Sequence, residues 1–230
     1  MLNNDWSLSP WLDELPYDWS ELEELGAVIS IKKDENLFLY NDPVEYIYIV
    51  REGRIRLSLN SVSGDEKTIA IIGKNGLLGE SDFFQNQRHV ATAIASSPSI
   101  VIKVKPMDFQ NVIFKNKIYM NQLLQMMSLK IRLLTQDSLY LAHSSSYQRI
   151  CLMFLQLGMS YGDDPKNPSQ INITIPFTQQ EVADLVGATR VTVANNIKLL
   201  ISKNIISKSG KYYCIENVAK LNEELYSIQT

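Results

Sequence analysis

The chain has few cysteines and no long apolar run. Cys151 and Cys214 are its only cysteines, so it lacks a disulfide framework, a CxxC pair and the roughly four thiolates that an iron–sulfur cluster requires. No stretch approaches 18 apolar residues, and acidic residues near the N-terminus, such as Asp5, interrupt any signal-peptide pattern. We therefore expect a cytoplasmic protein that has no membrane span.

Net charge is also small, at −3 with a pI near 5.5, which excludes a protein that coats nucleic acid through charge alone. At 45% hydrophobic residues, the chain can bury an ordinary core. Positive charge is concentrated in the segment 171–215, where two acidic residues accompany Arg190, Lys198, Lys203, Lys208 and Lys211. A basic module on an acidic body is typical of a protein that binds a few nucleic-acid sites selectively.

Residues that could carry catalysis are scarce. His89 and His143 are the only histidines, and neither is accompanied by a nucleophile, a metal-ligand cluster or a phosphate-binding loop. The two histidines leave haem open by residue type, but no motif supports it. We therefore expect no enzymatic activity and no cofactor.

The segment from Phe177 to Leu200, FTQQEVADLVGATRVTVANNIKLL, has the pattern of a helix-turn-helix. Thr178 and Glu181 form a capping box at the start of a first helix. Gly187 tolerates the left-handed conformation that ends this helix, and Thr189 can cap a second one. An ordinary helical hairpin inside a core is the alternative interpretation.

Short apolar runs alternate with turn residues between Ala27 and Lys105, as in YIYIV, RIRLSL and TIAII. Many short strands without a helical period predict a β-sandwich or β-barrel. Gly53 and the Gly64-Asp65 pair predict tight turns between strands.

The segment between Met107 and Ala142 lacks proline and glycine, which predicts one long helix. Apolar residues repeat in it at alternating steps of four and three, a heptad seam typical of a parallel dimer. The seam residues are Met120, Leu124, Met127, Ile131, Leu134 and Leu141. Leucines off the seam, Leu123, Leu133 and Leu139, predict that the helix also packs on the β-rich part. Ser145 is expected to cap the next helix.

This order of parts resembles the cyclic-AMP receptor protein/FNR (Crp/Fnr) superfamily of bacterial transcriptional regulators. The motifs YIVxxGxIxL, GDEKTI and LLGE and the ATA strand are similar to its cyclic-nucleotide-binding β-roll, and the likeness runs from about Ile29 to Ile215. It implies an α+β fold with a sensing domain over residues 1–106, a dimerisation helix over 107–142 and a winged helix-turn-helix DNA-binding domain over 143–230. Trp6, Trp11 and Trp19 precede the likeness, in an arm expected to pack on the roll.

The implied effector pocket departs from that of members that bind cyclic AMP. Gly79 and Glu80 match the Gly-Glu pair of those members, but His89 and Val90 stand where they have Arg and Ser or Thr. Arg88 lies one residue early, so it is expected to face away from the pocket. Leu134 replaces the central-helix Thr that reads adenine in those members. These departures disfavour cyclic AMP. Alternatively, Glu80, Arg88 and His89 form a solvated turn with a surface ion pair.

GDEKTI, VATA and RVTV are similar to the halorespiration (CprK-type) subgroup, whose members sense chlorinated aromatic acids. The resemblance therefore implies a small organic effector, such as a halogenated aromatic acid. A cyclic-nucleotide-responsive regulator and an effector-independent regulator with a degenerate pocket are the alternatives.

The resemblance also assigns DNA contacts on the second helix of the helix-turn-helix. Base contacts are assigned to Arg190, Val191, Ala194 and Asn195, because Arg matches guanine, Asn matches adenine and Val can meet a thymine methyl. Phosphate contacts are assigned to Thr178, Gln179, Thr192 and Lys198. Asn196, at a usually apolar position, is expected to be hydrogen-bonded or partly exposed.

The implied partners are a second copy of the chain, a pseudo-palindromic double-stranded DNA operator and RNA polymerase, whose contact in relatives corresponds to the loop Tyr161–Gln170. Lys208 and Lys211 flank Gly210 in a predicted β-hairpin wing. An interaction module whose winged helix no longer binds DNA is the remaining alternative.

Overall fold

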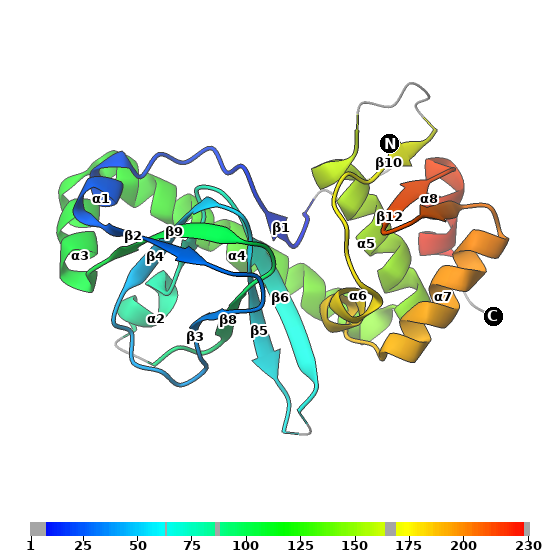
Figure 1. Ribbon diagram of the computed structural model, residues 1–230, viewed down its shortest axis with the longest axis horizontal. Coiled ribbons are helices and arrows are strands. Elements are labelled where there is room, and N and C mark those ends of the chain that lie inside the picture. The colour runs from blue at the N-terminus through cyan, green and yellow to red at the C-terminus, as the bar shows by residue number, and fades with distance from the viewer. Residues whose placement is uncertain (1–7, 63, 86–87, 164–168, 228–230) are drawn as a thin grey trace. The chain divides into compact units, whose positions relative to one another are not determined.

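The computed structural model describes residues 8–62, 64–85, 88–163 and 169–227. These residues fall into two compact units, one formed by residues 10–134 and the other by residues 135–227 together with 8 and 9 (Figure 1). We call them the sensor unit and the head unit. None of the helices in the described part of the chain combines the length and hydropathy needed to span a bilayer.

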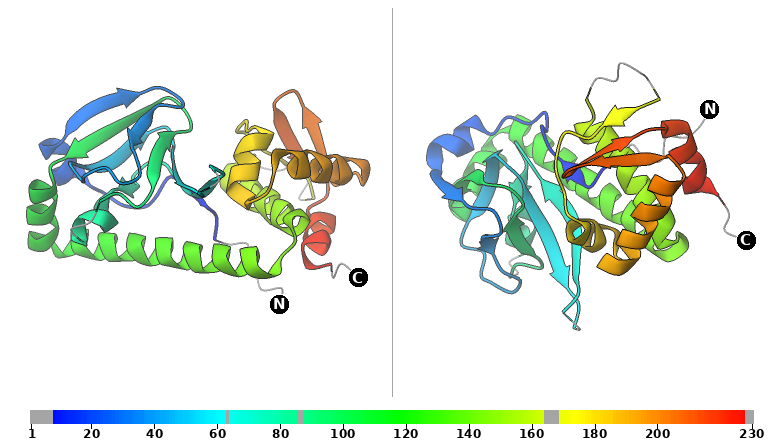
Figure 2. Two further views of the ribbon diagram at one scale, coloured as in Figure 1. Left: turned by 90° about the horizontal axis from the view of Figure 1, so that it is seen from below. Right: turned by 45° about the vertical axis from the view of Figure 1, so that its right-hand side comes forward.

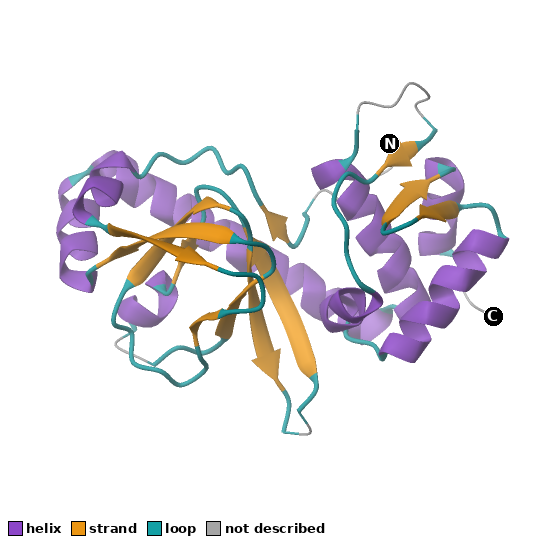
Figure 3. Ribbon diagram, viewed as in Figure 1, coloured by secondary structure: helices purple, strands orange, loops and turns teal. Residues whose placement is uncertain are grey.

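The sensor unit is built on two β-sheets (Figure 3). The first runs in the order β1 (Trp11–Leu12), β6 (Glu66–Ile72), β5 (Ile55–Asn60), β8 (Thr92–Ala95) and β3 (Asn36–Phe38). The second runs in the order β2 (Ala27–Ile31), β9 (Ser99–Val104), β4 (Ile47–Glu52) and β7 (Leu77–Leu78). Helices α1 (Ser20–Leu25), α2 (Glu80–Phe84) and α3 (Pro106–Lys115) complete it with the first part of α4. The predicted β-rich domain is confirmed.

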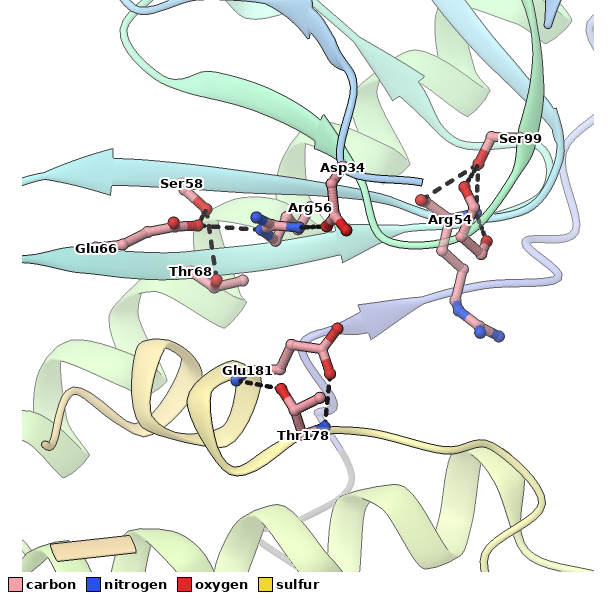
Figure 4. Close-up of polar contacts among 10 residues, drawn as sticks. Asp34, Arg54, Arg56, Ser58, Glu66, Thr68, Ser99, Thr178 and Glu181 are labelled. Carbon is pink, nitrogen blue, oxygen red and sulfur yellow. Dashed lines mark hydrogen bonds and ion pairs between the residues drawn. The ribbon is translucent and has the colours of Figure 1, made fainter. Parts of the chain in front are cut away.

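Polar contacts fix the register of the β5–β6 hairpin (Figure 4). Glu66, from the GDEKTI motif, accepts hydrogen bonds from Arg56 Nε at 3.1 Å and from Ser58 Oγ at 2.5 Å. Arg56 also lies 3.6 Å from Asp34, so its guanidinium is held between two carboxylates. Glu66 of this motif therefore stabilises the pairing of β5 with β6.

The N-terminal arm packs on the sensor unit, as predicted. Trp11 pairs with Ile71 in the parallel β1–β6 ladder. Trp19 is almost fully buried, and its indole N–H donates to the carbonyl of Asn75 at 2.8 Å. Trp6 lies outside the described residues.

The predicted single helix over residues 107–142 is wrong in one respect, because α3 ends at Lys115 and α4 (Lys117–His143) begins after Asn116. Asn116 is extended, with φ −113° and ψ 107°, and its side chain accepts from the N–H of Ile118 at 2.9 Å, so it caps a new helix. Leu123 and Leu133 are buried on the sensor side of α4, as expected. Leu139 is exposed, which corrects its assignment to that side.

Besides the last part of α4, the head unit contains further helices and a small sheet (Figure 2). The helices are α5 (Ser146–Tyr161), α6 (Gln179–Val186), α7 (Arg190–Ser202) and α8 (Val218–Tyr226). The sheet runs in the order β10 (Ile171–Asn172), β12 (Tyr212–Ile215) and β11 (Ile206–Ser209). Phe154 of α5 lies at the core of the head unit, near the stacked rings of Phe177 and Tyr213. As predicted, Ser145 caps α5, in a capping box with Gln148.

Candidate functional site

The helix-turn-helix is formed by α6 and α7 and follows the predicted local signals. Glu181 Oε2 accepts from the N–H of Thr178 at 2.6 Å, and Thr178 Oγ1 accepts from the N–H of Glu181 at 3.1 Å (Figure 4). Gly187 ends α6 in the left-handed conformation, with φ 63° and ψ 55°. Thr189 then caps α7 by accepting from the N–H of Thr192 at 3.1 Å. These contacts fix the angle at which the chain enters the second helix.

One face of α7 packs on the head unit and another is open to solvent. Val193, Ile197 and Leu200 are buried at helical spacing. The predicted base-contacting residues lie on the other side: Arg190 and Asn195 are exposed, Val191 is 70% exposed, and Ala194 is half-buried. Among the predicted phosphate contacts, Thr178 and Lys198 are exposed, whereas Gln179 and Thr192 are half-buried.

Asn196 lies between these two faces. It is half-buried, and its amide donates to the hydroxyl of Ser146 on α5 at 3.4 Å. This agrees with the expectation that a polar residue at a usually apolar position would find a partner. The contact ties α7 to the first turn of α5.

The basic residues of the head unit differ in whether their charge is exposed or paired. Lys208 and Lys211 are exposed on the β11–β12 hairpin, which turns at Gly210 with φ 60°. Lys203 lies at the end of α7, but its ammonium is 2.7 Å from Glu224 Oε1 on α8. Its charge is therefore committed to an ion pair inside the unit. The loop Tyr161–Gln170 is described only in part, so its predicted polymerase contact falls largely outside the described residues.

A cavity of about 220 Å³ lies in the sensor unit between the β-strands, α2 and α4. Most of its walls are apolar. The lining residues include Phe38, Leu57, Ile69, Ala70, Val90, Ala91, Met127, Ile131, Leu133 and Leu134. The polar part of the wall comes from Gly79, Glu80, Ser81, Asp82 and Lys130. Gly79, Glu80, Val90 and Leu134 of the predicted pocket thus meet at one site.

A buried ion pair lies in the polar wall of this cavity. Lys130 Nζ is 2.5 Å from Glu80 Oε1 and donates to the carbonyl of Leu77 at 2.9 Å. Glu80 is only 1% exposed, and no described residue hydrogen-bonds its second oxygen, Oε2. An acceptor and a cation are therefore presented together inside an otherwise apolar space.

Two of the predicted pocket residues do not line the cavity. His89 is buried under the wall: its Nδ1 lies 2.9 Å from Asp82 Oδ2, and its ring stacks on Phe38 at a centroid distance of 3.7 Å. Arg88 donates through Nε to the carbonyl of Asn41 at 2.5 Å, away from the cavity. The alternative of a solvated turn is therefore wrong for Glu80 and His89, because both are buried.

Lys130, Asp82 and Phe38 line the cavity but were not singled out from the sequence. The sequence contains a pattern that could have identified Lys130. It lies on the inner side of α4, in a series that repeats at steps of four and three: Tyr119, Leu123, Met126, Lys130 and Leu133. A single charge on such an apolar stripe needs a buried partner. The pairing of Asp82 with His89 has no comparable local pattern.

Comparison with known proteins identifies a family for part of each unit. Residues 28–116 match the family described as cyclic nucleotide-binding domain, and residues 148–224 match the Crp-like helix-turn-helix domain. The chain belongs to the Crp/Fnr family of transcriptional regulators. It is therefore a DNA-binding regulator with an effector-binding domain, in a family of non-enzymatic proteins.

Similar proteins cover nearly its full length. The global nitrogen regulator of Synechococcus elongatus is 26% identical over 227 residues, which span 97% of this chain and 99% of that protein. The fumarate and nitrate reduction regulatory protein of Vibrio cholerae is 24% identical over 223 residues, 95% of this chain and 88% of that protein.

Solved structures share the fold at lower identity. A complex of CprK with OCPA superposes with a TM-score of 0.74 at 18% identity, covering 94% of this chain and 97% of that one. A variant of CooA from Carboxydothermus hydrogenoformans superposes with a TM-score of 0.76 at 19% identity, covering 90% of this chain and 91% of that one. At this identity the likeness shows the fold alone.

Proposed function

We propose that this regulator acts as a homodimer on a pseudo-palindromic operator, and that a small, mostly apolar organic acid in the sensor cavity controls its binding. A halogenated aromatic acid is the effector class that fits best. The observation that carries this proposal is the cavity itself, whose apolar walls enclose one ion pair.

The size and chemistry of the cavity favour such a ligand. Ligand pockets usually measure about 300–1,000 Å³, so a cavity of about 220 Å³ suits a small molecule. An ammonium has three donors. Lys130 uses one on Glu80 and one on Leu77, which leaves a third for a ligand carboxylate. Glu80 Oε2 can accept from a ligand hydroxyl.

A cyclic nucleotide is the less favoured alternative. The phosphate of such a ligand needs strong donors, yet Lys130 is the only cation among the described lining residues. Arg88 bonds Asn41 instead, and Val90 offers the cavity a hydrocarbon side chain. CprK has a similar fold and was solved in complex with OCPA, which supports ligand binding by a protein of this fold.

Dimerisation is supported by the outer face of α4. Leu124 is 58% exposed and Ile131 is 60% exposed, and both lie on the predicted heptad seam. Met120 and Met127, also on the seam, are half-buried. A row of exposed apolar side chains on a long helix is stabilised when a second copy covers it.

A thermal-shift screen tests the effector. Purified protein is heated with cyclic AMP, cyclic GMP, 2-oxoglutarate and a set of chlorinated aromatic acids. A ligand at 100 times its dissociation constant adds about 2.7 kcal/mol to the free energy of unfolding. We expect a shift with one or more aromatic acids that is lost in Lys130→Met. A shift with cyclic AMP alone would favour the nucleotide alternative, and no shift with any compound would favour a degenerate pocket.

A further inference from the structure

The first turn of α5 connects the helices of the head unit. Ser146 contacts Asn196 of α7, and the hydroxyl of Tyr147 donates to Glu224 Oε2 of α8 at 3.0 Å. Gln148 donates to the carbonyl of Leu225, the next-to-last residue of α8, at 3.1 Å. Arg149, the fourth residue of this turn, makes contacts that neither the sequence motifs nor the DNA-contact assignments explain.

Arg149 bonds three backbone carbonyls that belong to two different chain turns. Its Nε donates to Val186 at 2.7 Å and its Nη2 to Gly187 at 3.1 Å, which are the last residue of α6 and the residue that turns the chain toward α7. Its Nη1 donates to Ser144 at 2.6 Å, directly after the end of α4. One guanidinium thus joins the end of α4 to the turn of the helix-turn-helix.

These carbonyls are suitable partners for a cation. The last carbonyls of a helix lack intrahelical donors and carry partial negative charge. Burial lowers the pKa of Arg149, and the carboxylate of Asp137 on α4 counteracts that effect. A planar guanidinium can bond several carbonyls at once, whereas a lysine ammonium at the same position lacks this fork of donors.

We propose that Arg149 is a positioning residue for DNA recognition. It holds the turn between α6 and α7 against the end of α4, and so fixes the direction in which α7 presents Arg190 and Asn195. Its three hydrogen bonds are to backbone carbonyls, so its effect on DNA is transmitted through Val186 and Gly187. Because Ser144 follows α4 directly, any displacement at that end reaches the turn through the same side chain. This role requires only DNA binding by the head unit and is independent of the effector.

Arg149→Lys tests this role, with Arg132→Lys at an exposed position of α4 as the matched control. The probes are a duplex selected from a random pool by the wild-type protein and a scrambled duplex of the same length. We expect Arg149→Lys to weaken binding of the selected duplex by about threefold to thirtyfold. Binding of the scrambled duplex and the salt dependence should be unchanged, because no phosphate contact is lost. Amide hydrogen exchange at 187–190 should become faster, while circular dichroism shows a folded protein.

Three results would overturn the proposal. Equal losses on both duplexes, with a shallower salt dependence, would make Arg149 a phosphate contact. If Arg149→Lys keeps the wild-type affinity and the wild-type rate of amide hydrogen exchange, the three carbonyl bonds do not position the turn. If Arg149→Lys does not fold, Arg149→Gln, which keeps a planar donor group, replaces it. If both variants lose affinity only to the extent that they lose the circular dichroism signal of the folded protein, Arg149 is a stabilising residue and not a positioning one.

Discussion

The ammonium of Lys130 lies 2.5 Å from Oε1 of Glu80, so an ion pair joins α4 to the turn that starts α2. Glu80 is the residue that the family resemblance marks, and Lys130 is on the inner stripe of α4. Removing charges from water is costly, and this pair is tolerated because each group neutralises the other. A ligand that bonds either partner therefore acts on the helix that carries the exposed seam.

Breaking this pair from the lysine side should be strongly destabilising. Lys130→Met leaves the carboxylate of Glu80 buried without a counter-charge, and we expect the free energy of unfolding to fall by about 3 kcal/mol. Urea denaturation at pH 7 measures it. Lys115→Met, at an exposed position of α3, is the control and should change stability by less than about 0.5 kcal/mol. Equal small effects would mean that the pair contributes nothing.

The exposed seam of α4 should be required for dimerisation. Leu124→Glu places a charge on the proposed interface, whereas Gln125→Glu places the same charge on the neighbouring exposed position outside it. Sedimentation equilibrium should show that Leu124→Glu is shifted toward the monomer and that Gln125→Glu remains dimeric. A dimer unaffected by Leu124→Glu would locate the interface elsewhere.

The two cysteines should differ sharply in reactivity. Burial raises the pKa of Cys151 to about 12, so at pH 8 only about one molecule in ten thousand carries its thiolate. Cys214 is half-buried, and its pKa is also raised by burial, in part offset by a hydrogen bond from Gln170. Iodoacetamide followed by mass spectrometry should label Cys214 first and Cys151 only in denaturant. Native labelling of Cys151 at a comparable rate would contradict the packing around α5.

The head unit should lose stability in acid through Glu224. Hydrogen bonds from Lys203 and Tyr147 hold the pKa of this carboxyl below its ordinary value of 4.5. The ionised carboxyl therefore stabilises the fold above that pH, and the stabilisation disappears as pH falls through the folded-state pKa. Glu224→Gln should cost about 1–2 kcal/mol at pH 7 and progressively less below pH 4.5. Glu223→Gln, at the adjacent exposed position, is the control. A cost of Glu224→Gln that is constant with pH would rule out the ionised pair as its source.

Local signals in the sequence predicted the head unit well. The capping box of Thr178 and Glu181, the left-handed Gly187 and the Thr189 cap each depend on residues within four positions of one another, so the sequence contains the whole interaction. The apolar spacing of the heptad seam is equally local, and its assignment to a dimer interface stays a prediction. Asn116 was missed because asparagine is compatible with a helix interior, and the break appears only in its extended backbone and its side-chain bond to Ile118.

Long-range packing in the sensor unit was not readable in the same way. His89 was placed in the pocket by counting from the Gly-Glu pair. Its stacking on Phe38, however, depends on the pairing of β3 with β8, and these strands are far apart in the sequence. Lys203 was counted among the free basic residues. Its partner, Glu224, lies in α8, a helix that no sequence motif predicted. Composition gives the charge of a segment, whereas tertiary pairing decides which charges remain free.

The most direct test of the account is DNA binding by two variants of α7, measured by fluorescence anisotropy on the selected and scrambled duplexes. Asn195→Ala should cost about 1–3 kcal/mol on the selected duplex, relax one base position and leave scrambled binding unchanged. Lys198→Ala should weaken both duplexes alike and lower the salt slope by about one. Equal, sequence-independent losses in both variants would contradict the claim that the exposed face of α7 reads the operator.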